Sequence, residues 1–184
     1  MNYSLPKSVY INGEEFKIRY DFKAILDILA MLNDPELSSA EKGSALITIF
    51  YTEPEKITDY SEAIKKCFEF IDCGTEDRGK SPKLVDWEQD FQYIVAPVNR
   101  VLGMEIRESD VHWWTFISAY MEIGSDCLFS QIVSIRDKQA RGKKLEKSES
   151  EWLSRNRHLV AFKQRFTEEE TNMISAWTGG GMNG

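Results

Sequence analysis

Three carboxylates in the middle of the chain are the first residues that could do chemistry. Asp86, Glu88 and Asp90 stand at alternate positions, and paired carboxylates serve as general acids and bases or as ligands for a hard cation. The same spacing is typical of a helix start, where a side chain caps backbone N–H groups and negative charge favours the positive end of the helix dipole. We therefore interpret these residues as a helix start.

Histidine and cysteine are the other side chains with catalytic or metal-binding chemistry. His112 and His158 have no further ligand at a metal-site spacing, and Cys67, Cys73 and Cys127 have no paired spacing. We find no nucleophile elbow, zincin helix, phosphate loop or dinucleotide fingerprint. We therefore expect a protein that is not an enzyme and uses no metal or cofactor. A Cys–His pair assembled across the fold stays open.

An aromatic segment contains the first candidate contacts for a partner. Trp113, Trp114 and Tyr120 belong to residue types that are more often core, yet they are also the usual anchors of binding hot spots. Adjacent tryptophans on a helix point about 100° apart. One of the two is therefore expected in the core, and the other is expected to be available.

A basic run contains the remaining candidates. From position 136 to 165 the chain has ten Lys/Arg against four Asp/Glu, or +6, so the remainder carries −13. A solvated corner between two helices is the first interpretation, an acidic protein partner the second and nucleic acid the last, because acidic residues are interspersed. The candidate partner-binding residues here are Arg136, Arg141, Lys143, Lys144 and Lys147.

The elements that position these residues begin with a β-hairpin over residues 8–20. Apolar and polar residues alternate on both sides of Asn12-Gly13, a dipeptide that tolerates the positive φ angles of a tight primed turn. Two strands alone are marginal in water. Their apolar side must therefore pack on helices.

Apolar residues at helical spacing predict the helices, and capping residues predict where they start. The helix after Ser109-Asp110 is apolar almost all round, so it must be central in the core or covered by a partner. If the helix containing Pro97 continues to Gly103, a kink is expected there. The expected N-terminal signals are Asp21, Ser38 with Glu41, Thr58-Asp59, Asp86 with Gln89, Ser109-Asp110 and Ser148 with Glu151.

We therefore predict a mainly α fold, with the N-terminal β-hairpin packed on a bundle of about six to seven helices. Residues 1–166 are expected to form a single globular domain. It consists of a hairpin-plus-helices half (1–73), an exposed loop (74–83) for which a hinge is the alternative, and a helical half (84–166). Residues 167–184 are expected to be a short helix or a flexible C-terminal tail.

Composition limits the setting. A net charge of −7 with 42% hydrophobic residues favours solubility and argues against attraction of the whole surface to nucleic acid or anionic lipid. The cysteine spacing suits a reducing cytoplasm. No apolar run approaches the roughly 18 residues of a membrane span, so we expect no membrane contact.

Five motifs, taken in order, resemble a family of small tail-assembly proteins from tailed phages and prophages of Gram-positive bacteria. They are LVDWEQD (84–90), VHWWTF (111–116), MEIG (121–124), IVSIR (132–136) and GKKLEK (142–147). Members of that family are encoded between the major tail protein and the tape-measure protein. The likeness covers the chain from the early helices to about Val160.

The resemblance implies a non-enzymatic tail-assembly chaperone. Such a protein binds the tape-measure protein and helps recruit tail-tube subunits, acts in the host bacterial cytoplasm and is absent from the mature virion. The family has no established active site, so no catalytic residue carries over. Self-association stays open. The alternative is a structural subunit retained in the mature phage tail, and the third hypothesis is nucleic-acid binding through the basic segment 136–147.

Overall fold

The structure is a computed structural model that describes residues 4–74, 82–163, 165–170 and 172–173. It has a mainly α fold with an N-terminal hairpin, which confirms the prediction. The elements are β1 (Ser8–Ile11), β2 (Glu14–Lys17), α1 (Phe22–Leu32), α2 (Ser39–Phe50), η1 (Pro54–Lys56), α3 (Tyr60–Ile71), α4 (Trp87–Leu102), η2 (Ile106–Glu108), α5 (Trp113–Met121), α6 (Leu128–Ala140) and α7 (Lys147–Val160). Residues 168–170 and 172–173 are also helical.

The hairpin forms as the sequence predicts. Asn12 and Gly13 adopt φ values of 50° and 86°, which is the geometry of a primed turn. Val9 pairs with Phe16 across the two strands. Phe16 and Ile18 are buried, so one face of the hairpin packs on the helices, as expected for an otherwise marginal pair of strands.

Local capping starts four of the helices where the sequence predicts. Asp21, Asp59 and Asp86 each accept the backbone N–H three residues on. Ser38 forms a complete capping box with Glu41. These bonds involve residues within one turn of each other, which explains why the sequence alone identifies them.

Three capping predictions are wrong. Gln89 does not complete a capping box, because its side chain bonds residues near the C-terminus. The cap of α5 is His112 rather than Ser109-Asp110. The cap of α7 is Glu146 with Glu149 as its box partner, two residues before the predicted start.

His112 replaces the predicted cap because several elements meet at its ring. Its Nδ1 accepts the N–H of Trp114, and its Nε2 lies 2.8 Å from the carbonyl of Pro6. The ring stacks on Tyr20. A bridge between Asp21 and His112 joins the start of α1 to the start of α5, so tertiary contacts fix where α5 begins.

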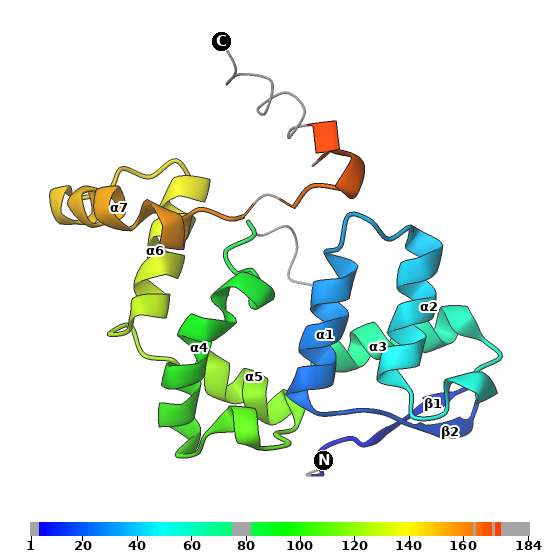
Figure 1. Cartoon of the computed structure of the whole chain (residues 1–184). Helices are drawn as coiled ribbons and strands as arrows, with labels where there is room; N and C mark the ends of the chain where they lie inside the picture. Colours follow the sequence, from blue (N-terminus) through cyan, green and yellow to red (C-terminus); the bar gives the residue numbers. More distant parts are fainter. Residues whose placement is uncertain (1–3, 75–81, 164, 171, 174–184) are drawn as a thin grey trace.

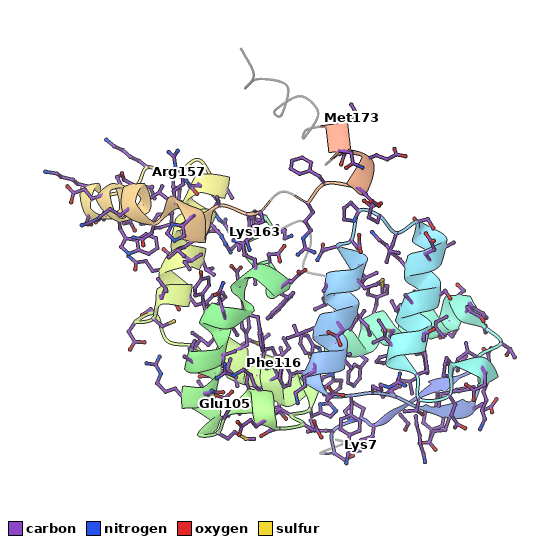
Figure 2. The ribbon with its side chains drawn as sticks, viewed as in Figure 1. Lys7, Glu105, Phe116, Arg157, Lys163 and Met173 are labelled. Atoms are coloured by element: carbon purple, nitrogen blue, oxygen red, sulfur yellow. The ribbon has the colours of Figure 1, made fainter. Side chains whose placement is uncertain are left out.

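One hydrophobic core extends from Ile11 of the hairpin to Phe129 of α6. Phe116 of α5 stacks on Phe22 of α1, with ring centroids 4.8 Å apart. Phe116 is also labelled in the interior of the molecule in Figure 2. Of the two predicted alternatives for α5, a central place in the core or cover by a partner, the structure shows the first. Both halves of the chain contribute to this core.

Figure 1 shows two groups of helices side by side. The hairpin, α1, α2 and α3 form one group, and α4, α5 and α6 form the other. α7 packs on α6 and projects from the second group, so we call α6 and α7 the arm. Most of the predicted loop (75–81 of 74–83) and the C-terminal residues 174–184 lie outside the described residues.

Within the described part of the chain, no helix is both long and apolar enough to cross a lipid bilayer.

Candidate functional site

The two adjacent tryptophans join α5 to the end of α3. Their indole N–H groups donate to the carbonyls of Ile71 and Phe70, at 2.8 and 2.9 Å respectively, in the last turn of α3. Trp113 is only 2% exposed. Trp113 is therefore a core residue and not the partner contact that the sequence suggested. Trp114 is half-buried, and its one polar atom already has a partner.

Tyr120 is half-buried on the side of α5 that faces α6. Its ring packs on Trp87 and Phe129, with centroids 5.0 and 5.7 Å away. Burial, with a smaller contribution from the negative charge of Asp90, raises the pKa of Tyr120 to about 12. The phenol is therefore neutral at physiological pH. Beside it, Met121 is exposed.

Arg136 is buried inside the arm and is not a surface contact, which corrects the sequence-based assignment. Its side chain is 3% exposed and pairs with Asp90 of α4, whose side chain is fully buried. The guanidinium donates five hydrogen bonds, two to the carboxylate and three to backbone carbonyls. The carbonyls belong to Leu84, Leu159 and Val160, and the ring of Phe162 covers the guanidinium. Arg136 therefore connects α6 to α4, to the segment before α4, to the end of α7 and to Phe162.

The other basic candidates lie at the tip of the arm. Arg141 pairs with Asp137 at 2.6 Å on the surface. Lys143, Lys144 and Lys147 are exposed, and none of the three forms an ion pair with the described residues. The tip is thus a solvated basic corner, which is separate in space from the tryptophan joint.

The three carboxylates of α4 have different surroundings. Asp86 caps the helix and also accepts hydrogen bonds from Lys83 and Arg165. Burial alone would raise its pKa, but these bonds and the nearby positive charges lower it overall. Asp90 accepts the backbone N–H of Asp86 in addition to its bonds with Arg136. The helix-start interpretation is right for Asp86, whereas Asp90 forms a buried ion pair.

An open, largely apolar site lies between α1 and α4, and we call it the α1/α4 groove. It has a volume of about 370 Å³ and an apolar lining of Phe22, Leu26 and Ala30 from α1 with Trp87 and Phe91 from α4. Lys23, Asp27, Glu88 and Arg107 supply charges of both signs. A second hollow continues along α4 past Phe91 to Val95 and Ala96.

The sequence did not identify this groove. The apolar stripes of both helices predict a core-facing side, and they do so correctly for Phe22 and Ile94, which are buried. The apolar periodicity by itself does not distinguish the positions that face the core from those that border an open groove. One signal was present in α1, where Lys23 and Asp27 flank the apolar Leu26.

The described residues contain no group of three or more side chains placed to hold a metal ion. Cys67 is buried, and burial raises the pKa of its thiol. A protonated thiol in an apolar setting is a poor nucleophile. The open groove, with its apolar lining and mixed charges, is suited to holding another chain.

Comparison with known proteins gives one match. A family model described as Bacteriophage Gp15 protein matches residues 1–162. Searches of curated proteins and of solved structures gave no match. The matched region contains the hairpin, both helices that border the groove, and the whole arm. The chain therefore belongs to the Bacteriophage Gp15 protein family.

Proposed function

We propose that this phage protein is a non-enzymatic tail-assembly chaperone that binds a helix of the tape-measure protein in the α1/α4 groove. The observation that carries the proposal is the groove itself, which pairs an apolar lining with charges of both signs. An amphipathic helix binds such a groove through apolar anchors at helical spacing, while charged side chains set its register. Membership of the Bacteriophage Gp15 protein family supports a role for the protein in a bacteriophage.

The dimensions of the groove suit a short stretch of helix. Its lining on α1 runs from Phe22 to Ala30, which corresponds to about 12 Å of helix. Two to three turns of a partner helix would therefore contact it at a time. A long tape-measure helix would bind through a segment of this length, and tail-tube subunits would be recruited to the resulting complex in the host cytoplasm.

Co-expression with the tape-measure protein of the same phage tests the proposal. We expect the two proteins to co-purify and the tape-measure protein to become more soluble. Leu26→Glu places a charge among the apolar anchors, and we expect it to weaken binding by about tenfold or more. Ala30→Trp fills the groove without adding charge and should have the same effect.

Val101→Glu is the matched control, because Val101 is an exposed apolar residue of α4 outside the groove. We expect this variant to bind as the wild type does. Thermal unfolding of each variant shows whether the fold is retained. Absence of co-purification by the folded wild-type protein would contradict the chaperone proposal. Equal binding by the wild type and both groove variants would show that the tape-measure protein binds a surface other than the groove.

A further inference from the structure

The chain after α7 runs past the start of α4, beside the α1/α4 groove, and we call this segment the strap (residues 161–163 and 165–170). Gln89 of α4 holds its first part, because its side-chain amide donates to the carbonyl of Ala161 and accepts the N–H of Lys163, both at 2.9 Å. Figure 2 labels Lys163 between the arm and the rest of the molecule. The strap is therefore attached where α4 begins.

Arg165 continues the attachment at the rim of the groove. Its guanidinium lies 2.9 Å from a carboxylate oxygen of Asp86 and 2.9 Å from one of Glu88. Glu88 is also one of the residues that line the groove. The strap thus supplies a cation to one of the charged side chains that a partner would meet.

Beyond Arg165 the strap reaches the loop that follows α1. The N–H of Glu168 donates to the side chain of Glu36, which lies in the loop after α1. The strap therefore runs from the first turn of α4 to the loop between α1 and α2. Figure 1 shows the described part of this segment above the start of α4 and near the loop between α1 and α2. A helix in the groove meets the strap at the end formed by Ala30 and Glu88.

We propose that the strap is an intramolecular competitor that closes this end of the groove, and that a partner helix with a basic residue there displaces Arg165. This inference rests on the proposed function and concerns the regulation of the same site. A partner of no more than two to three turns fits beside the strap. A longer helix needs the strap to leave, and its own Lys or Arg then pairs with Glu88.

The contacts of the strap suit a segment that is held but can be released. The side chains of Arg165 and Glu88 are 28% and 63% exposed, and an ion pair at such positions is weak. The second partner of Arg165, Asp86, is only 6% exposed, so most of the attachment of Arg165 depends on that pair. Phe166 is exposed rather than packed. The family match ends at residue 162, so the groove lies within the matched region and the strap beyond Phe162 lies outside it.

Arg165→Ala removes both ion pairs and tests the inference in the full chain. We expect about fivefold tighter binding of the tape-measure protein, because its helix no longer has to displace the strap. Arg155→Ala is the matched control, since Arg155 is an exposed cation of α7 with no ion pair to a described residue. It should leave the affinity unchanged. Hydrogen exchange should show that the N–H groups of Lys163 and Glu168 lose protection when the partner binds.

Nile red, a neutral apolar dye, tests the strap without any partner. We expect Arg165→Ala to bind more dye than the wild type, and the added Ala30→Trp substitution to abolish the gain. Tape-measure binding with unchanged affinity in Arg165→Ala and unchanged protection of the strap would overturn the inference and leave the chaperone proposal standing. If neither the wild type nor any variant binds the tape-measure protein, the proposed function is contradicted. Equal dye binding by Arg165→Ala and the wild type would then also overturn the inference that the strap closes the groove.

Discussion

The side chain of Arg136 has the largest number of tertiary hydrogen bonds in the site region. All five guanidinium N–H groups have acceptors within 3.1 Å. Removing one partner of a buried pair leaves an uncompensated charge, which costs far more than the pair itself contributes. The stability of the arm on α4 therefore depends on this residue.

We expect Arg136→Met to lower the free energy of unfolding by about 3–5 kcal/mol, because Asp90 is left charged and buried. Urea unfolding followed by circular dichroism measures the change. Arg141→Ala removes an exposed ion pair and should cost less than about 1 kcal/mol. If the two variants lose the same stability, the guanidinium of Arg136 has no special role.

Asp86 gives the protein a pH-dependent contribution to stability. Its pKa is lowered in the folded state, so the contribution is fully present above the unfolded pKa of about 3.9 and is lost as the pH falls through the folded pKa. We expect Asp86→Asn, which keeps a capping side chain, to cost about 1–2 kcal/mol near neutral pH. Below about pH 4 the difference from wild type should shrink. A difference that is constant from pH 3 to 7 would refute this account.

At the scale of elements, the joint between α3 and α5 depends on two indole N–H groups. Trp114→Phe keeps an aromatic ring against Phe70 but leaves the carbonyl of that residue without the indole donor. We expect a loss of about 1 kcal/mol in thermal unfolding. Trp152→Phe on α7 is the comparison, because the indole of Trp152 donates to no described residue. A larger loss of stability for Trp152→Phe than for Trp114→Phe would contradict the stabilising role of the Trp114 hydrogen bond between α3 and α5.

Most elements were predictable because their signals are local. The hairpin turn at Asn12-Gly13 and the caps at Asp21, Ser38 and Asp86 depend on residues at most four positions apart. The prediction for α7 failed because two similar signals compete there. Glu146 with Glu149 and Ser148 with Glu151 have the same spacing, and Glu149 also pairs with Lys138 of α6, so tertiary packing favours the earlier start.

At the scale of the whole molecule, the charges are arranged unevenly. The exposed lysines of the basic corner lie at the tip of the arm, whereas the groove is on the other side of α4. The two candidate contact surfaces are therefore separate. This separation suits a protein that holds one partner in the groove and leaves the arm accessible to another.

The chaperone proposal predicts that the protein is absent from finished phage particles. Mass spectrometry of purified virions measures this directly, with the tail-tube protein as the internal reference. We expect no peptides from this chain at a fixed ratio to that reference. A constant copy number per virion would support the alternative, a structural subunit that stays in the tail.

The sequence by itself determined the hairpin, most helix starts, the mainly α fold and the likeness to a phage protein family, because each depends on neighbouring residues or on motifs in order along the chain. Only the tertiary structure decided which candidates are accessible. Arg136 meets Asp90 across 46 positions, and Trp113 meets α3 across 42, so both are buried by contacts that no local pattern encodes. The α1/α4 groove likewise exists only when two helices pack and leave a furrow between them.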